Sequence, residues 1–252
     1  MALIHSSPIS SPSITLDSIA MAGAGVVRIS QPAKGHRFTT DSILLADFCR
    51  LKKNDRVLEP GAGTGVISLL LARKFSSASF TAVELQPTLA DLCSWNIHVN
   101  SLDQRISVLS KSITRLKGTF KPGSFDAIVA NPPFTKRGTG KESPRTARST
   151  SRSDGAAPLE AWLDLAGFLK NGGRYFLVFP AARSAELLTQ LRERNLEPKG
   201  IRFVHPFAGE PASIILVEAV KRGGSGMDVL PPLIVHGPDG KYTEEVRAIY
   251  GS

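Results

Sequence analysis

The stretch VLEPGAGTGVISLLLA, from Val57 to Ala72, places three glycines between two apolar segments. The first segment belongs to a short strand over Arg56–Glu59, and Thr64–Lys74 has the continuous apolar face of a helix. Glycines at such a junction let the backbone turn sharply and leave room for a ligand beside it. The stretch therefore predicts a strand, a ligand-binding turn and a helix in succession, which is the opening unit of an α/β fold.

Outward from this unit, short apolar runs continue to alternate with helix-like segments. Further strands are predicted at Ser79–Leu85, Ile106–Leu109, Phe125–Ala130 and Arg174–Phe179. Further helices are predicted at Pro87–Val99, at Leu159–Leu169 with Asn171-Gly172-Gly173 as its C-cap signal, and at Ala181–Arg194. Alternation at this spacing indicates crossover connections and a parallel sheet covered on both faces.

The last two predicted strands, Ile201–His205 and Ser213–Val220, are joined by the short link PFAGEPA without a helix. Strands with so short a link pair as an antiparallel hairpin. The fold class expected is therefore α/β: a Rossmann-like, doubly wound sheet of seven strands, mostly parallel, with a C-terminal antiparallel hairpin.

The chain is expected to form one globular unit in two parts. Residues 1–50 form an N-terminal extension with strands and turns over Thr15–Ser30 and one helix over Thr40–Arg50. Residues 51–252 form the main domain, and its stretch VLPPLIVHGPDGKYT predicts a strand-like terminal extension with a turn at Pro-Asp-Gly.

Composition narrows the class of protein. The 252 residues are 42% hydrophobic and 21% charged, which is ordinary for a globular domain. There is neither an apolar run long enough to span a membrane nor a secretory signal in the opening residues, so we expect no membrane partner and a cytoplasmic location. Cys49 and Cys93 are expected to be buried free thiols, and the five histidines show no metal-ligand spacing, so no metal is predicted.

The net charge of +9 favours a polyanionic partner such as nucleic acid. Between Phe134 and Gly155, six basic residues stand against two acidic ones, which places +4 in this segment. We expect RNA phosphate contacts here, and the candidates are Lys136, Arg137, Arg145 and Arg148. Alanine at Lys136, Arg145 and Arg148 should weaken RNA binding and flatten its salt dependence. The alternative is that the segment is merely a solvated surface.

The glycine turn is followed 19 residues later by Glu84, at the end of the next predicted strand. A carboxylate there can accept hydrogen bonds from both hydroxyls of a ribose. Glu59, just before the turn, would repel the pyrophosphate of a dinucleotide but suits a cationic ligand. S-adenosylmethionine carries a sulfonium, an ammonium and a ribose but no phosphate, and is therefore the expected cofactor. The alternative role of Glu59 is to brace the turn or the helix dipole.

Asn131-Pro132-Pro133-Phe134 directly follows the fourth predicted strand. The prolines fix the backbone direction. The Asn131 side-chain oxygen and the Pro132 carbonyl can each accept one N–H of a planar amine, such as N6 of adenine, and stabilise positive charge that develops on it. Phe134 can stack on the ring. The alternative is a rigid strand exit with a core phenylalanine.

These features together resemble the Rossmann-like class I methyltransferases, in which Asn-Pro-Pro-Tyr/Phe marks amino-methylating enzymes. Three segments resemble more narrowly the bacterial tRNA1(Val) adenine-N6-methyltransferase group: QPAKGHRFTTDSILLADF (Gln31–Phe48), EPASIILVEAVKRG (Glu210–Gly223) and VLPPLIVHGPDGKYTEEVRAIY (Val229–Tyr250). The similarity runs from about Thr15 through nearly the whole chain. It implies N6 methylation of an adenine in the anticodon region of tRNA.

The resemblance also implies roles for individual residues. Asn131, Pro132, Pro133 and Phe134 would form the acceptor site. The cofactor-binding candidates are Phe38, Thr39, Glu59, Gly61, Ala62, Gly63, Gly65, Glu84, Ser112 and Asn131. The chain departs from the family twice, with Ser112 where many relatives have an acid that binds the cofactor's adenine amine, and with Phe134 where tyrosine is common.

Three alternatives remain open at this stage. Protein-glutamine N5-methyltransferases use the same motif but usually carry a helical bundle in front, for which this chain offers only about 50 residues. Amino methylation of DNA or ribosomal RNA shares the core chemistry. A catalytically silent RNA-binding module would lack cofactor binding. We expect the chain to act as a monomer, with a weak homodimer as the alternative.

Overall fold

The computed structural model describes residues 13–35, 37–133 and 157–251, and its centre is a nine-stranded mixed sheet. The strand order is β10-β8-β9-β7-β6-β3-β4-β5, and β11 also pairs with β8. The strands are β3 (Arg56–Pro60), β4 (Ser79–Glu84), β5 (Ile106–Ser110), β6 (Phe125–Ala130), β7 (Leu169–Pro180), β8 (Leu196–Phe207), β9 (Ile214–Lys221), β10 (Asp228–Val229) and β11 (Leu233–His236). All neighbouring pairs are parallel except those of β9, which is antiparallel to β7 and β8.

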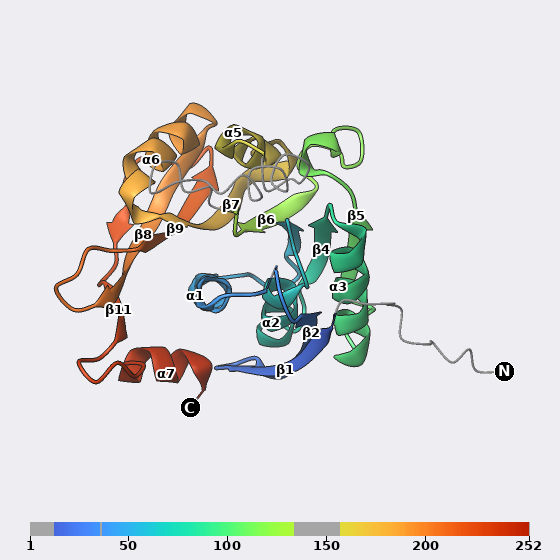
Figure 1. Cartoon of the computed structure of the whole chain (residues 1–252). Helices are drawn as coiled ribbons and strands as arrows, with labels where there is room; N and C mark the ends of the chain where they lie inside the picture. The colour runs from blue at the N-terminus through green and yellow to red at the C-terminus, as the bar shows by residue number, and fades with distance from the viewer. Residues whose placement is uncertain (1–12, 36, 134–156, 252) are drawn as a thin grey trace, which may run out of the picture.

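Helices cover both faces of this sheet (Figure 1). On one face lie α1 (Thr40–Phe48), α2 (Val66–Lys74) and α3 (Pro87–Val99), and on the other α5 (Leu159–Leu163) and α6 (Ser184–Glu193). The two faces bury separate apolar clusters, one containing Leu69 of α2 and the other Trp162 of α5. Strands between two apolar layers must be apolar on both sides, which explains their near-continuous hydrophobic runs. The predicted Rossmann-like fold is thus confirmed, with two short strands added at its C-terminal edge.

The N-terminal segment forms a hairpin of β1 (Ile14–Met21) and β2 (Gly25–Pro32), separate from the main sheet. Two asparagines of the α3 end attach this hairpin to the domain. Asn96 accepts the N–H of Ser30 at 2.7 Å and donates to its carbonyl at 2.9 Å, and Asn100 does the same with Arg28 at 3.0 and 2.7 Å. The buried polar groups are thereby satisfied, so the hairpin has a fixed position on the helix layer.

Two local predictions needed correction. The predicted C-cap at Asn171-Gly172-Gly173 is wrong, because these residues lie inside β7, where the pairing with β6 shifts register. The preceding helix ends earlier, at Leu163, and is followed by a 3-10 turn over Asp164–Phe168. The C-terminal extension holds β10, β11 and also a short helix, α7 (Glu244–Tyr250). The Thr243 hydroxyl caps this helix by accepting the N–H of Val246. Short 3-10 turns complete the fold at Ile113–Arg115 and Ala181–Arg183.

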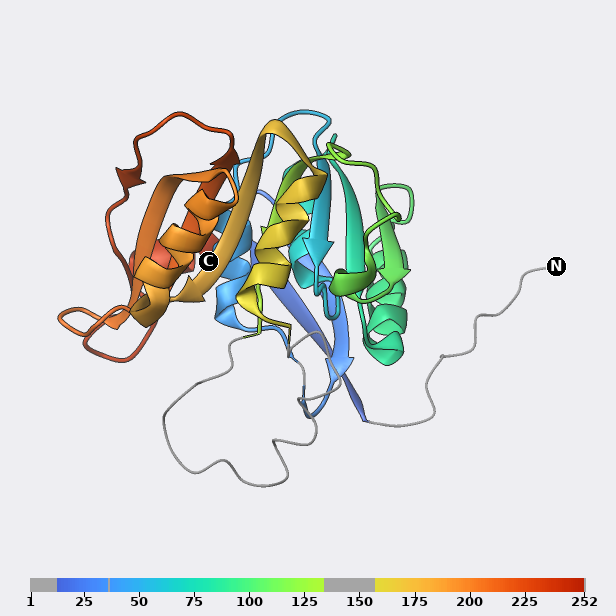
Figure 2. The ribbon, with the colours of Figure 1, turned by 90° about the horizontal axis from the view of Figure 1, so that it is seen from above.

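The carboxyl ends of the parallel strands all reach one edge of the sheet. Figure 2 shows the molecule from above, with this edge toward the bottom of the picture. The turn after β3, the end of β4 and Asn131 after β6 therefore meet there. Ligand sites of open α/β sheets form at this edge because the turns and helix N-termini converge on it.

Candidate functional site

The glycine turn between β3 and α2 requires glycine for two different reasons. Gly61, Gly63 and Gly65 all have positive φ, at 65°, 57° and 84°. A side chain on Gly61 would also lie 2.6 Å from Trp162 Cη2, and one on Gly65 would lie 2.6 Å from Cys93 Sγ. At Gly63 a Cβ would meet no atom within 4 Å, because this glycine faces open space. The turn is thus closely packed at Gly61 and Gly65 and open at Gly63.

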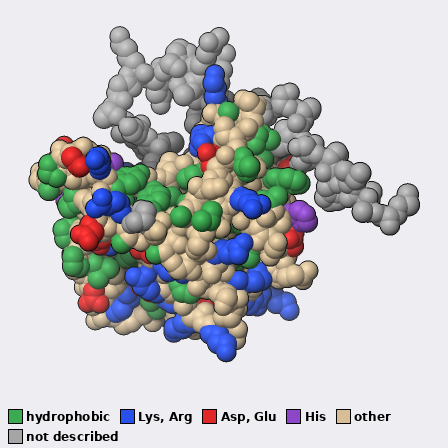
Figure 3. Space-filling model, turned by 90° about the horizontal axis from the view of Figure 1, so that it is seen from below, with side chains coloured by type: hydrophobic (Ala, Val, Ile, Leu, Met, Phe, Trp, Pro, Cys, Tyr) green, Lys and Arg blue, Asp and Glu red, His purple; other side chains and the backbone are tan. Residues whose placement is uncertain are grey.

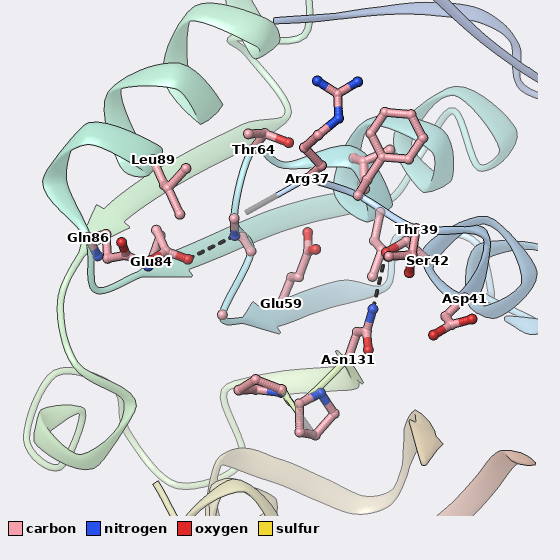
Figure 4. A pocket seen from close by; sticks show the side chains of 18 of the residues that line it. Arg37, Thr39, Asp41, Ser42, Glu59, Thr64, Glu84, Gln86, Leu89 and Asn131 are labelled. Carbon is pink, nitrogen blue, oxygen red and sulfur yellow. Dashed lines mark hydrogen bonds between the residues drawn. The ribbon is translucent and has the colours of Figure 1, made fainter. Parts of the chain in front are cut away.

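Backbone hydrogen bonds join the turn to the end of β4. The Ala62 N–H donates to the Val83 carbonyl at 2.9 Å. Glu84 then receives one N–H on each oxygen, from Gly63 on Oε2 and from Gln86 on Oε1, both at 2.8 Å. A carboxylate oxygen has two lone pairs, so each can accept a further donor. Glu84 is only 6% exposed, and its side chain points into the cleft (Figure 4).

Glu59 lies at the floor of the cleft and braces the first turn of α2. Its Oε2 accepts the Ser68 N–H at 2.9 Å and the Ser68 hydroxyl. Burial raises the pKa of Glu59 to about 7, against the opposing effect of the two Ser68 bonds. The turn-bracing alternative for this residue is therefore realised in the fold, while Glu59 also remains part of the cleft lining. A cation in the cleft would favour the ionised form.

Asn131 forms the opposite wall of the cleft. Its Nδ2 donates to the Ser42 hydroxyl at 3.1 Å, so the amide is held by the first turn of α1 (Figure 4). Among the described residues no donor engages Asn131 Oδ1, which leaves this oxygen for a ligand. Pro132 and Pro133 line the same cleft. Phe134, the predicted stacking ring, lies outside the described residues.

The cleft between these walls has a volume of about 280 Å³. It brings together most of the predicted site: Phe38, Thr39, Glu59, Gly61, Ala62, Gly63, Glu84, Asn131, Pro132 and Pro133 all line it. Gly65 supports it from outside as the N-cap of α2. Ser112 does not line the cleft; its hydroxyl caps the following 3-10 turn by accepting the Thr114 N–H at 3.2 Å. Cofactor contact by Ser112 therefore stays a prediction.

Other residues of the cleft were missed by sequence reasoning. Ser42 holds the catalytic candidate Asn131, and Asp41 beside it has a pKa raised by burial. Arg37 lines the cleft but bonds to the N-terminal hairpin, donating to Thr15 Oγ1 at 2.8 Å and to Asp17 at 3.1 Å. The signal for these residues was the Gln31–Phe48 segment, which contains Arg37, Asp41 and Ser42.

The predicted RNA contacts Lys136, Arg137, Arg145 and Arg148 lie outside the described residues. Both cysteines are free and buried, as predicted. In the described ranges, no three His, Cys, Asp or Glu side chains gather closely enough to hold a metal ion. None of the helices described has both the length and the apolar character needed to cross a bilayer.

Comparison with known families is consistent with this geometry. Residues 36–150, which contain the glycine turn, Glu84 and Asn131, match the family model described as methyltransferase small domain. Over this stretch the chain is similar to the methyltransferase small-domain family. It is an S-adenosylmethionine-dependent methyltransferase, and the cofactor predicted from the sequence is thereby confirmed.

Similar curated proteins carry a more specific name. This methyltransferase is 23% identical to the tRNA1(Val) (adenine(37)-N6)-methyltransferase of Vibrio campbellii, over 86% of this chain and 89% of that one. The enzymes of the same name from Shewanella woodyi and Aeromonas hydrophila are 26% and 28% identical, over 85% and 81% of this chain and 90% and 84% of theirs. The resemblance stated from the sequence is confirmed by these relatives.

Solved structures agree on the fold of this methyltransferase. A predicted O-methyltransferase from Agrobacterium tumefaciens superposes with a TM-score of 0.67 at 22% identity, over 84% of this chain and 95% of that one. The geranyl diphosphate C-methyltransferase of Streptomyces coelicolor A3(2), in complex with S-adenosyl-L-homocysteine, superposes with a TM-score of 0.53 at 14% identity, over 72% and 77%. At these identities the likeness concerns the fold alone.

Proposed function

We propose that this enzyme transfers a methyl group to the exocyclic N6 of an adenine in the anticodon region of tRNA. The observation that carries the proposal is the position of Asn131, which lines the same cleft as the glycine turn and Glu84 and has its Nδ2 held by Ser42 (Figure 4). The names of the relatives with matching length support tRNA as the substrate.

The cofactor wall fits S-adenosylmethionine in its donor set and its space. Glu84 keeps an accepting lone pair on each oxygen for ribose hydroxyls. The open space at Gly63 lets a ligand approach the backbone closely. Leu89 and Leu85 supply apolar lining beside the carboxylate, which suits a purine ring. Burial raises the pKa of both Glu59 and Asp41, and a bound cation would favour their ionised forms, which would supply negative charge beside it. Bound S-adenosylmethionine would supply an electrophilic methyl carbon.

The acceptor wall would act by positioning rather than by removing a proton first. Asn131 Oδ1 and the Pro132 carbonyl would each accept one N–H of the adenine amine, which holds the nitrogen lone pair toward the methyl donor. Both acceptors interact more strongly as positive charge develops on the nitrogen, so they favour the transition state over the bound substrate. Ser42 would fix the Asn131 amide so that its oxygen, and not its NH2 group, faces the substrate.

Charge supports a polyanionic substrate. On the face in Figure 3, Lys and Arg side chains are more frequent than Asp and Glu. We also propose, from the sequence alone, that Lys136, Arg137, Arg145 and Arg148 contact RNA phosphates, because this basic segment directly follows the acceptor motif. As an enzyme of tRNA it would act in the cytoplasm, as a monomer, with residues 1–50 as an extension and 51–252 as the catalytic domain.

The proposal is tested by incubating the full chain with labelled S-adenosylmethionine and an unmodified tRNA1(Val) transcript, followed by digestion and identification of the methylated nucleoside. We expect N6-methyladenosine. Label in protein with untouched RNA would support glutamine methylation instead. Label in DNA or ribosomal RNA, with tRNA unmodified, would show that the enzyme methylates an amine of a different nucleic acid.

A further inference from the structure

Four aromatic rings lie next to one another in series on the C-terminal side of the molecule, two of the three neighbouring pairs being stacked and the third tilted. Phe207, His236, Tyr242 and Tyr250 follow one another with ring centroids 5.3 Å apart at every step. The interplanar angle falls from 34° at the Phe207 end to 20° and then 15° at the Tyr250 end. We call this series the aromatic ladder. Rings at this spacing attract one another, so the ladder holds its rings in place before any ligand binds.

The ladder lies at the same edge of the sheet as the acceptor wall. β7 and β8 both pair antiparallel with β9, so they run in the same direction, and β11 is parallel to β8. Phe207 ends β8 and His236 ends β11, while Asn131 follows β6, which is parallel to β7. Phe207, His236 and Asn131 therefore share the edge at which ligands of such sheets bind.

The inner end of the ladder touches the wall of the cleft. Tyr242 Oη lies 3.5 Å from Thr40 Oγ1, and the Tyr250 hydroxyl also meets Thr40. Thr39 and Asp41, the chain neighbours of Thr40, both line the cleft. The ladder thus continues outward from the rim of the cleft along the surface.

The outer end of the ladder is open. Phe207 has one ring face against His236 and is 37% exposed, and among the described residues no further ring stacks on it. Tyr242 is likewise 36% exposed. The series of rings therefore ends at the surface, where a further planar ring can be added to it.

We propose that Phe207 stacks on a nucleobase of the same RNA loop that carries the target adenine, so that the ladder holds the loop against the cleft. The inference rests on the proposed function and names a second contact of its substrate. Unpaired loop bases offer bare π-faces, and single-stranded RNA is commonly bound by stacking them on aromatic side chains. A base placed on Phe207 would extend the series of rings by one more step.

The test compares Phe207→Leu with Phe207→Tyr, using the unmodified tRNA1(Val) transcript as the RNA. Leucine keeps apolar bulk without a ring, and tyrosine keeps the ring. We expect Phe207→Leu to raise the KM for tRNA about 5- to 100-fold, with kcat at saturating tRNA and S-adenosylmethionine affinity unchanged, and Phe207→Tyr to retain the wild-type KM. Trp95→Leu is the matched control, because Trp95 lies on α3, which packs on β5 at the opposite end of the sheet (Figure 1).

The outcomes separate this inference from the proposed function. If the wild-type enzyme methylates tRNA but Phe207→Leu has the wild-type KM, or Trp95→Leu raises it equally, the ladder contact is overturned and the proposed function stands. If the wild-type enzyme does not methylate tRNA, the proposed function and the ladder contact are both wrong. Equal melting temperatures of the Leu and Tyr variants ensure that a raised KM reports a lost contact rather than unfolding.

Discussion

The two walls of the cleft are held in place by contacts of different kinds. The cofactor wall is fixed by short-range bonds within β3, α2 and β4, such as those from Ala62 to Val83 and from Gly63 to Glu84. The acceptor wall depends on one side-chain bond from Asn131 to Ser42, which lies 89 positions earlier in the chain. A wall held by bonds within one strand-helix-strand unit is rigid as soon as that unit folds, whereas a wall held by a side chain from a distant part of the chain is rigid only in the complete structure.

The largest expected effect is on the acceptor wall. Asn131→Ala removes one of two acceptors that interact most strongly in the transition state, so kcat should fall about 10²- to 10³-fold, or about 3–4 kcal/mol of barrier. The affinity for S-adenosylmethionine, measured by calorimetric titration, should change little, because Glu84 and the glycine turn are untouched. Equal losses in kcat and cofactor affinity would show that the two walls are not independent.

A pH effect is expected from the floor of the cofactor wall. Glu59 has a folded pKa of about 7 against an ordinary 4.5, so the folded protein holds this proton more tightly than the unfolded chain does. The stability of the wild type should therefore fall as pH rises from about 4.5 to 7 and then level off, by up to about 3 kcal/mol. In Glu59→Gln the stability should not show this fall with pH, because glutamine does not ionise, while its side-chain oxygen can still accept the Ser68 N–H.

The measurement is urea denaturation of both proteins, without cofactor, between pH 5 and 8. The difference in free energy of unfolding between variant and wild type should grow in favour of the variant as pH rises. Curves that stay parallel would mean that Glu59 is ionised at low pH in the fold and is not the buried acid that its surroundings indicate.

The glycine turn offers a comparison within the cofactor wall itself. Gly61→Ala and Gly63→Ala share the strain of a positive φ, but only the first places a methyl 2.6 Å from Trp162 Cη2. Thermal and urea unfolding should therefore show Gly61→Ala to be less stable than Gly63→Ala by about 2 kcal/mol. Gly63→Ala should instead weaken cofactor binding, because its methyl faces the open cleft. If Gly63→Ala were the less stable variant and Gly61→Ala the one with weaker cofactor binding, the cofactor would not approach the turn at Gly63.

The smallest expected effect concerns the bond between the two walls. Ser42→Ala leaves the Asn131 amide free to rotate, so kcat should fall about 10-fold, equivalent to about 1.4 kcal/mol, with KM values little changed. The informative control is the double variant. Once Asn131 is alanine, removing the Ser42 hydroxyl should cost nothing further in kcat. Additive losses would mean that Ser42 acts on the reaction by a route other than Asn131.

The sequence by itself determined the glycine turn, the acid at the end of the next strand and the succession of strands and helices along the chain. These features depend on residues that are close in the chain, so they can be recognised in the sequence alone. They are the alternating apolar runs, the glycines after Val57–Pro60 and the acid that ends Ser79–Glu84. The short link between the last two predicted strands was likewise enough to predict the antiparallel hairpin of β8 and β9. The failures were equally local: Asn171-Gly172-Gly173 has the composition of a helix cap, and only pairing with β6 shows that it lies within a strand.

Only the tertiary structure decided what touches Asn131 and what surrounds the cleft. Ser42 comes from α1, and the rings of the aromatic ladder come from β8, β11, the turn after β11 and α7. No periodicity connects such residues, because strands of one sheet bring their carboxyl ends to a common edge whatever their distance along the chain. The sequence therefore identified the chemistry of the site, and the packing of the sheet selected the residues that orient it.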